Sequence, residues 1–346
     1  MRAIVKTKMA PGAELLDIPI PMPKPDEVLV KMKAVSICGT DVHIYEWDSA
    51  AQMYIKNVPQ IMGHEFAGEI VEVGKKVKKF RVGDYVSAET HIFCGKCLQC
   101  KNNQKNICEK GEIFGLTCDG CFAEYAAIPE IIIWKNNPQL PPEIATLQEP
   151  LGNAIYCSLA NDKNLNGKKV LIIGDGPIGL LATGVCYAEG AETVVLVGLE
   201  EERLKIARRM GAFTLNGENP NATKILLDFT NKRKFDVALE MAGNAKASAM
   251  ALNMVRNGGR MSAFGIYGGP FFIENYGNFV RSGIEIQAIS GRRIWQTWKE
   301  TRRLLESGLL DITPIITHKL PLAEFQKGFD LMIKRPKVSG KVILLP

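Results

Sequence analysis

Residues 168–190 read KKVLIIGDGPIGLLATGVCYAEG and combine an apolar run, a glycine-rich turn and a helical pattern. The turn has the spacing G-x-G-x-x-G, in which the first glycine permits a tight bend, the second lets the backbone approach a pyrophosphate and the third allows close packing of helix on strand. Because this turn lies between a strand and a helix, it predicts a dinucleotide-binding unit. The residues expected to contact the dinucleotide there are Gly174, Gly176, Pro177, Ile178 and Gly179.

The next expected strand, within 193–203, bears on the choice of dinucleotide. An acidic residue normally ends this strand and binds the adenosine ribose hydroxyls. Here Gly198 stands at that place, and residues 200–202 are glutamates followed by Arg203. Without the acid a 2′-phosphate could enter and pair with Arg203, but the glutamates would repel it. We expect a nicotinamide dinucleotide, with NAD favoured over NADP.

The pattern of apolar and polar residues along the rest of the chain predicts two domains. Apolar runs at 168–174 and 193–198, with a helical pattern at 202–212 after them, are typical of parallel strands covered on both faces. Before about Pro142, short alternating runs indicate antiparallel strands joined by tight turns. We therefore expect an α/β protein with a mostly β domain and a doubly wound parallel sheet. The expected domains are residues 1–148 with 290–346, and residues 149–289.

The composition excludes several classes of protein. Lys and Arg number 43 against 37 Asp and Glu and are spread along the chain, which does not favour a nucleic-acid-binding protein. No apolar stretch is long enough to cross a membrane, and the N-terminus lacks an export signal. We expect a cytoplasmic protein. Nine cysteines, an odd number, are better explained by metal ligation than by disulfides.

Four of these cysteines fall within fifteen positions, at the spacing Cys-x2-Cys-x2-Cys-x7-Cys. Four thiolates on one short loop can close a tetrahedral shell around a structural zinc ion. An iron–sulfur cluster is the main alternative, but the long last gap and the lack of a proline after the fourth cysteine disfavour it. Incidental thiols are the other alternative. The expected ligands are Cys94, Cys97, Cys100 and Cys108.

A second metal site is expected from residues of mixed type. Cys38, His64 and Glu65 are candidate ligands of a catalytic zinc ion, and Glu149 is a possible fourth or exchanging ligand. A catalytic zinc ion typically takes three protein ligands and leaves one position open. Each of these residue types is more often structural when considered alone. The glycines beside Cys38 and His64 place both where strands break into turns.

Three further residues near these ligands are candidates for catalysis. An alcohol that loses a hydride must also lose its hydroxyl proton, and Thr40 and His43 could pass that proton to solvent. Alternatively, His43 is a surface histidine bonded to the backbone. His91, beside the cysteines, is either close to the active site or structural.

These segments together resemble the zinc-containing medium-chain alcohol dehydrogenases along nearly the whole chain. The resemblance is carried by SICGTDVHIYEW, PQIMGHEFAGEIVEVG, GDYVSAETHIFCGKCLQC, ATLQEPLGNA, GDGPIG and PIITHKLP. It implies a GroES-like catalytic domain, a Rossmann domain, two zinc ions per subunit and a homotetramer. It also implies the ligand and relay roles given above, and links His91 to substrate recognition.

Within this family the chain is most similar to members that oxidise L-threonine to 2-amino-3-oxobutanoate. We expect zinc to bind the secondary hydroxyl and lower its pKa, while the hydride passes to the nicotinamide. Gly198 and Asp175 depart from the pattern of NAD-preferring members. Oxidation of a polyol or sugar acid is the first alternative. The second is a non-catalytic zinc and nucleotide-binding protein, which predicts salt-sensitive polyanion binding.

Overall fold

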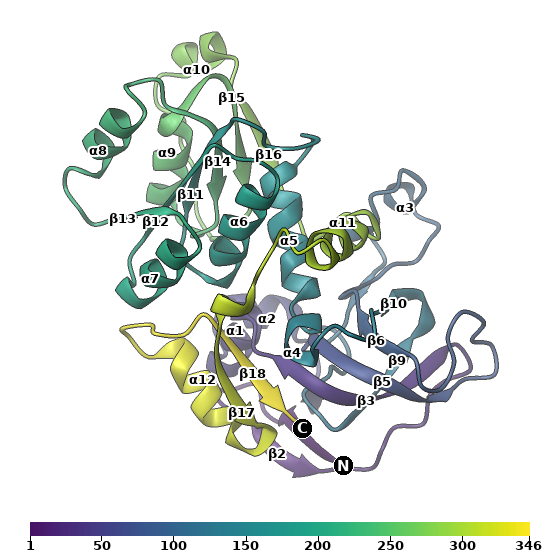
Figure 1. The fold of residues 1–346 in the computed structure, drawn as a ribbon. Helices are drawn as coiled ribbons and strands as arrows, with labels where there is room; N and C mark the ends of the chain where they lie inside the picture. Colours follow the sequence, from purple (N-terminus) through teal and green to yellow (C-terminus); the bar gives the residue numbers. More distant parts are fainter. The chain divides into compact units, whose positions relative to one another are not determined.

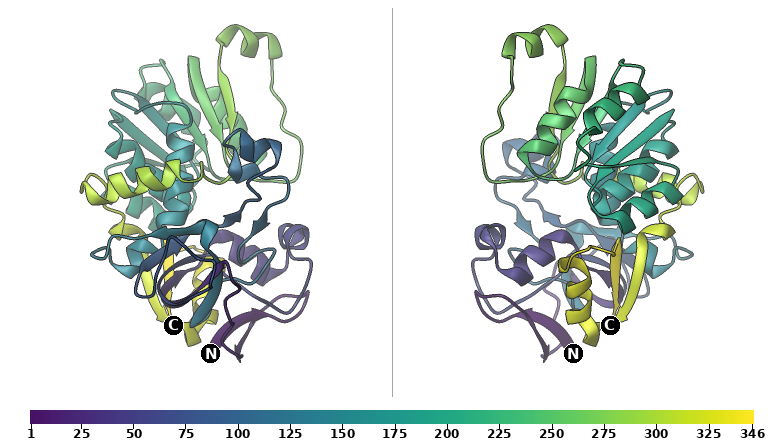
Figure 2. Two further views of the ribbon diagram at one scale, coloured as in Figure 1. Left: turned by 90° about the vertical axis from the view of Figure 1, so that its right-hand side faces the viewer. Right: turned by 90° about the vertical axis from the view of Figure 1, so that its left-hand side faces the viewer.

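The computed structural model describes residues 1–346 and divides into two compact units. Unit 1 comprises Met1–Glu149, Ile316–Arg335 and Lys341–Pro346, and unit 2 comprises Pro150–Ile315 and Pro336–Gly340. Both chain termini therefore belong to unit 1, where they lie at the same end (Figure 2). The structure describes a single chain, so the expected homotetramer stays a prediction.

Unit 1 is mostly β structure. Its largest sheet has the strand order β10-β6-β5-β3-β18-β17, and β9 pairs with β3 outside this path. The strands of this sheet are β3 (Glu27–Ser36), β5 (Glu65–Val73), β6 (Tyr85–Ala88), β9 (Tyr125–Pro129), β10 (Ile133–Lys135), β17 (Ile316–Pro321) and β18 (Lys341–Leu345). The pairings of β3 with β5, β9 and β18 are all antiparallel, as the alternating runs predicted.

Smaller elements complete unit 1. One small sheet contains β2, β1 and β4, and another contains β7 and β8. Their strands are β1 (Arg2–Lys6), β2 (Glu14–Asp17), β4 (Gln60–Ile61), β7 (His91–Ile92) and β8 (Glu112–Ile113). The helices are α1 (Gly39–Glu46), α2 (Ser49–Tyr54), α3 (Leu98–Lys101), α4 (Pro142–Ala145) and α12 (Phe325–Ile333).

Unit 2 is a parallel sheet with helices on both faces (Figure 1). The strand order is β13-β12-β11-β14-β15-β16. The strands are β11 (Lys169–Ile173), β12 (Thr193–Gly198), β13 (Phe213–Asn216), β14 (Phe235–Glu240), β15 (Val255–Ala263) and β16 (Glu285–Ala288). The helices are α5 (Gln148–Leu159), which begins in unit 1, α6 (Pro177–Ala188), α7 (Glu201–Arg209), α8 (Ala222–Phe229), α9 (Ala245–Met254), α10 (Tyr276–Ser282) and α11 (Gln296–Glu306).

The sheet of unit 2 aligns the ends of its central strands. Ile173, the last residue of β11, pairs with Val197 of β12 on one side and Glu240 of β14 on the other. The apolar side chains of β11 and β12 are buried, as expected for strands covered on both faces. The predicted fold class, a mostly β domain together with a doubly wound parallel sheet, is confirmed.

Residues 290–315 lie in unit 2, whereas the sequence analysis grouped them with the first domain. The reason is a set of polar contacts that the amphipathic pattern of α11 does not reveal. Arg292 is buried and donates to Asn153 of α5 over 2.9 Å, and Arg303 of α11 pairs with Glu189 after α6. Trp298 of α11 is fully buried.

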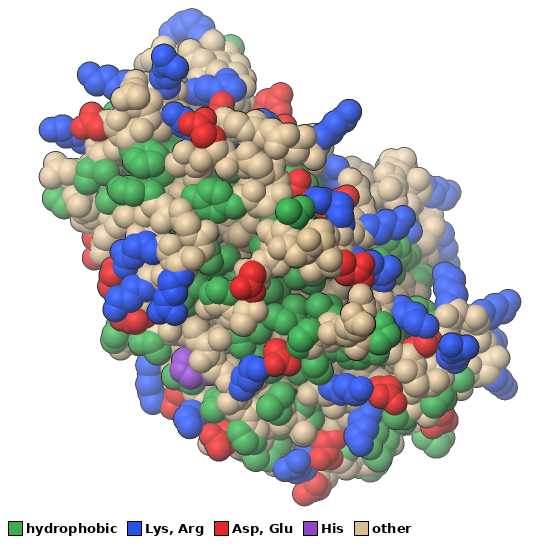
Figure 3. Space-filling model, in the orientation of Figure 1, with side chains coloured by type: hydrophobic (Ala, Val, Ile, Leu, Met, Phe, Trp, Pro, Cys, Tyr) green, Lys and Arg blue, Asp and Glu red, His purple; other side chains and the backbone are tan.

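Charged side chains of both signs are mixed on the surface. On the face in Figure 3, Lys and Arg side chains are interspersed with Asp and Glu over both units. No helix is both long and apolar enough to cross a membrane.

Replacement of Trp298 by alanine tests the assignment of α11 to the core of unit 2. The change removes a fully buried indole and is expected to lower the free energy of unfolding by about 3–5 kcal/mol. Urea denaturation followed by circular dichroism measures it. Lys299→Ala, on the exposed side of the same helix, is the control and should change stability by less than about 0.5 kcal/mol. Equal effects of the two changes would contradict the assignment.

Candidate functional site

Cys38 lies at the turn between β3 and α1. It is the N-cap residue of α1, and its backbone N–H donates to Oδ2 of Asp41 in the first helical turn over 2.8 Å. This reciprocal bond forms a capping box and fixes the thiol at the helix N-terminus. The Sγ atom of Cys38 lies 3.8 Å from Oγ1 of Thr40. The SICGTD segment thus positions both of these predicted residues.

His64 is held just before β5 by a tight turn. Gly63 has φ +89°, and a Cβ there would lie 2.1 Å from Phe122, so the turn requires glycine. The buried His64 Nδ1 lies 3.5 Å from Asp41 Oδ1. Burial lowers the pKa of His64, but the charges of Asp41 and Cys38 outweigh burial and hold this pKa well above its usual range. The surroundings therefore stabilise positive charge at this place.

Glu65 is fully buried at the first position of β5. Its Oε2 accepts hydrogen bonds from Ser36 Oγ and Lys341 Nζ, and Lys341 also donates to the carbonyl of Ile37 over 3.2 Å. Burial raises the pKa of Glu65, which the charge of Lys341 opposes. The other oxygen, Oε1, is buried and has no hydrogen-bond partner. A buried carboxylate oxygen of this kind costs free energy unless a cation or donor contacts it.

The ligand atoms of Cys38, His64 and Glu65 all lie within 4.8 Å of one another. A thiolate, an imidazole and a carboxylate are the ligand types that a catalytic zinc ion takes. The unpartnered Glu65 oxygen and the local preference for positive charge fit a bound cation. The structure thus brings together three of the four residues expected around the catalytic zinc ion.

Glu149, the fourth residue, lies at the start of α5 and is buried. Its Oε1 accepts a hydrogen bond from Thr90, and its charge contributes to the raised pKa of Glu65. Glu149 is not among the residues whose ligand atoms cluster within 4.8 Å. Whether it ligates zinc stays a prediction.

Two histidines near the candidate ligands each contact a carboxylate. His43 Nδ1 lies 2.5 Å from Oδ2 of Asp48, and the imidazole of His43 is about half exposed. His91 Nδ1 lies 2.7 Å from Oε1 of Glu89, which is fully buried. Asp48 also caps α2 by accepting from Ala50 N over 2.9 Å. Each carboxylate orients its imidazole through the Nδ1 atom.

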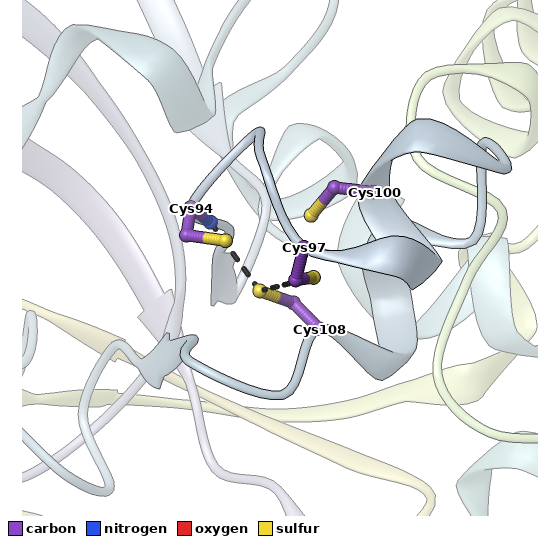
Figure 4. Close-up of side chains that lie close together, drawn as sticks. All are labelled: Cys94, Cys97, Cys100 and Cys108. Atoms are coloured by element: carbon purple, nitrogen blue, oxygen red, sulfur yellow. Dashed lines mark hydrogen bonds between the residues drawn. The ribbon is translucent and has the colours of Figure 1, made fainter.

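The second group of candidate metal ligands lies within residues 94–108 of unit 1, a segment that includes α3. The sulfur atoms of Cys94, Cys97, Cys100 and Cys108 point toward one another (Figure 4) and lie within 4.8 Å. The sulfurs of Cys97 and Cys108 are 3.7 Å apart. A tetrahedral shell with zinc–sulfur bonds of about 2.3 Å has sulfur–sulfur edges of about 3.8 Å.

The electrostatics of this cysteine cluster also call for a cation. Backbone N–H groups of Lys96 and Cys97 lower the pKa of Cys94 to about 6. Burial, followed by hydrogen bonds to neighbouring thiols, raises the pKa of Cys100 to about 12. All nine cysteines are free thiols, so no disulfide competes for these sulfurs. Four thiolates at this separation repel one another unless a metal ion neutralises them.

The glycine-rich turn joins β11 to α6 in unit 2. Gly174 has φ +122°, and a Cβ on Gly179 would lie 2.0 Å from the carbonyl oxygen of Gly174. Gly176 is the N-cap of α6, Pro177 follows as its first residue with Ile178 after it, and a Cβ on Gly176 would meet nothing within 4 Å. The backbone conformation and close packing of the turn thus require the first and third glycines. The second glycine leaves open space at the N-terminus of α6. This arrangement suits the pyrophosphate of a dinucleotide.

Gly198 and Arg203, at and just after the end of β12, are both close to other residues of unit 2. Gly198 ends the strand, and the space beside its Cα is taken by the side chain of Asp175. Arg203 is buried, and its Nε donates to the carbonyl of Ser339 over 2.7 Å. One N–H group of the guanidinium is therefore used within unit 2, and the side chain is buried there.

The sequence did not predict the residues that hold the candidate ligands and His43 in place. Asp41 stands three residues after Cys38, a capping-box spacing that could have identified it. Asp48 precedes a helix and could have been recognised as a cap. Lys341 gave no signal, because it is 276 positions from Glu65. Only the pairing of β18 with β3 brings it into the site.

Comparisons with known proteins agree with this geometry. Residues 24–138 match the family "Alcohol dehydrogenase GroES-like domain", and residues 177–307 match "Zinc-binding dehydrogenase". The chain is 46% identical to the L-threonine 3-dehydrogenase of Pyrococcus abyssi, over 100% of this chain and 98% of that protein. Other proteins of that name are 42–46% identical over the full chain.

Solved structures of similar proteins contain either dinucleotide. A zinc-binding dehydrogenase from Sinorhizobium meliloti 1021, bound to NADP, has a TM-score of 0.90 and 25% identity, covering 100% of this chain and 99% of that one. An alcohol dehydrogenase from Escherichia coli CFT073, complexed with NADH, has a TM-score of 0.91 and 26% identity with the same coverage.

Cys97→Ser tests the role of the cysteine cluster. The substitution should lower the zinc content by about one ion per chain and lower the melting temperature, because a closed thiolate site contributes to folding. Metal analysis by mass spectrometry and thermal denaturation measure both effects. Cys118→Ser, which alters a free thiol outside the cluster, should leave the zinc content unchanged. A full zinc content in Cys97→Ser would exclude the cluster as a zinc site.

Proposed function

The chain belongs to the zinc-binding dehydrogenase family with a GroES-like domain, and on that premise we propose that it oxidises the 3-hydroxyl of L-threonine. The acceptor is a nicotinamide dinucleotide, and the product is 2-amino-3-oxobutanoate. The grouping of Cys38, His64 and Glu65 carries the chemical part of this proposal. The identity to L-threonine 3-dehydrogenases over the whole chain supports the substrate.

Two zinc ions are proposed per subunit. Cys38, His64 and Glu65 would hold the catalytic ion, with Glu149 as a nearby acid, and the four clustered cysteines would hold the structural ion. When bound, the catalytic ion supplies a Lewis acid that lowers the pKa of an alcohol hydroxyl, and the nicotinamide supplies a hydride acceptor. Gly174, Gly176 and Gly179 would bind the pyrophosphate.

The side chains around Cys38 supply a path for the hydroxyl proton. Thr40 lies beside the Cys38 sulfur, and its hydroxyl can both accept and donate a proton. His43, on the same helix, has its Nδ1 fixed by Asp48, so that Nε2 is the atom that takes the proton. Because the imidazole is half exposed, it can release the proton to solvent. We propose that His91, oriented by Glu89, contacts the substrate.

A substrate panel tests the proposed activity. The purified protein, loaded with zinc, is offered L-threonine, hexitols and sugar acids with NAD or NADP, and reduction of the dinucleotide is followed by absorbance. We expect turnover of L-threonine, with NAD preferred. Cys38→Ser should lower kcat by at least about 100-fold, since it removes a ligand of the catalytic ion. Turnover of a polyol or sugar acid without turnover of L-threonine would contradict the substrate assignment.

Replacement of His43 tests the proton path. His43→Ala should lower kcat by about 10²–10⁴-fold, the usual contribution of a positioned acid–base group. Asp48→Asn keeps the oxygen that caps α2 but removes the charge beside His43, so a smaller loss is expected. Steady-state kinetics with L-threonine measure both. His318→Ala, at another histidine of unit 1, is the control, and an equal loss there would exclude a specific role for His43.

A further inference from the structure

Asp175 and Gly198 are coupled in space. Asp175 is the second residue of the glycine-rich turn after β11, and Gly198 is the last residue of β12. A Cβ built on Gly198 would lie 2.5 Å from the Cβ of Asp175 and 2.5 Å from its Oδ2. These distances are shorter than non-bonded atoms adopt. The Asp175 side chain therefore occupies the volume that a side chain at the end of β12 would fill.

The carboxylate of Asp175 is fixed at this place by the backbone. Its Oδ2 accepts from Leu199 N over 2.6 Å and from Glu200 N over 2.7 Å. The side chain is largely buried, so these charge-assisted bonds are shielded from water. The backbone N–H groups of Leu199 and Glu200 are therefore not available to donate hydrogen bonds to a bound anion.

The other charged groups at this end of β12 do not neutralise the negative charge that the Asp175 carboxylate would present to a bound ligand. Arg203 is 5% exposed and donates to the carbonyl of Ser339. Burial lowers the pKa of Arg203, and the charges of Asp175 and Glu200 oppose that shift. Oε2 of Glu200 accepts from the backbone N–H of Lys337 over 3.0 Å. The charged groups at this place are thus the carboxylates of Asp175 and Glu200 and the buried guanidinium of Arg203, so the net charge is negative.

We propose that Asp175 is the residue that determines dinucleotide specificity, and that it does so in place of an acid at the end of β12. Its carboxylate occupies the space at the end of β12 where the acid that binds the adenosine ribose normally stands, and it disfavours a 2′-phosphate by its charge and by occupying the Leu199 and Glu200 N–H groups. A ribose hydroxyl can still donate to the carboxylate. This inference rests on the dinucleotide binding in the proposed function. It assigns the preference for NAD over NADP to one residue.

Calorimetric titration with 5′-ADP and with 2′-phospho-ADP, which differs from it only by the 2′-phosphate, tests the inference without catalysis. Neither probe contains nicotinamide, so binding does not depend on zinc or substrate. The natural protein should bind 5′-ADP more tightly. In Asp175→Ala, the ratio of the two dissociation constants should shift toward 2′-phospho-ADP by about 10-fold or more, because a like charge at a binding site is strongly unfavourable. The ratio cancels any general weakening of the turn.

Two further variants sharpen the test. Glu201→Gln removes an acid that is exposed and paired with Arg208, and it should leave the ratio unchanged. The double variant Asp175→Ala, Gly198→Asp moves the carboxylate to the end of β12 without the steric conflict, and it should restore the preference for 5′-ADP. Gly198→Asp alone should weaken both probes, since its Cβ collides with Asp175.

The outcomes separate this inference from the proposed function. If the natural protein bound neither probe, dinucleotide binding itself would be excluded, and the inference with it. If it bound 5′-ADP but Asp175→Ala left the ratio unchanged, only the inference would be overturned. A natural protein that bound 2′-phospho-ADP at least as tightly as 5′-ADP would also overturn it.

Discussion

The buried carboxylate of Glu65 is the constraint on which the candidate active site depends. A carboxylate removed from water is costly unless positive charge or hydrogen-bond donors surround it. One of its oxygens is satisfied by Ser36 and Lys341, and the other is buried without a hydrogen-bond partner. The ligand atoms of Glu65, Cys38 and His64 lie within 4.8 Å of one another. A bound cation would complete the charge balance. A zinc ion held there would supply a Lewis acid for oxidation of an alcohol.

The sheet of unit 1 makes this arrangement possible. Ser36, the last residue of β3, pairs directly with Glu65, the first residue of β5, in an antiparallel register. On its other side Ser36 pairs with Ile343 of β18, which brings Lys341 from the end of the chain to the same place. Three strands distant in sequence thus converge on one carboxylate. The return of the chain to unit 1 after unit 2 is therefore needed for the site and not only for the core.

The sequence predicted the features whose residues are close along the chain. The four cysteines lie on one loop, and the glycine turn lies between adjacent elements, so spacing alone revealed both. It did not reveal Lys341, because its partner is 276 positions away. It identified Gly198 and Asp175 as separate departures, but their relation depends on the parallel pairing of β11 with β12. Residues 290–315 were grouped differently because buried contacts such as Arg292 with Asn153 are not visible in a hydrophobic pattern.

Anomalous diffraction at the zinc absorption edge, from crystals grown with zinc, would locate the metal ions directly. Two peaks are expected in each chain. One should lie among the four clustered cysteines, and the other should lie within about 2.0–2.3 Å of the ligand atoms of Cys38, His64 and Glu65. A single peak at the cysteine cluster, with the Glu65 oxygen bonded to a protein donor instead, would contradict the account.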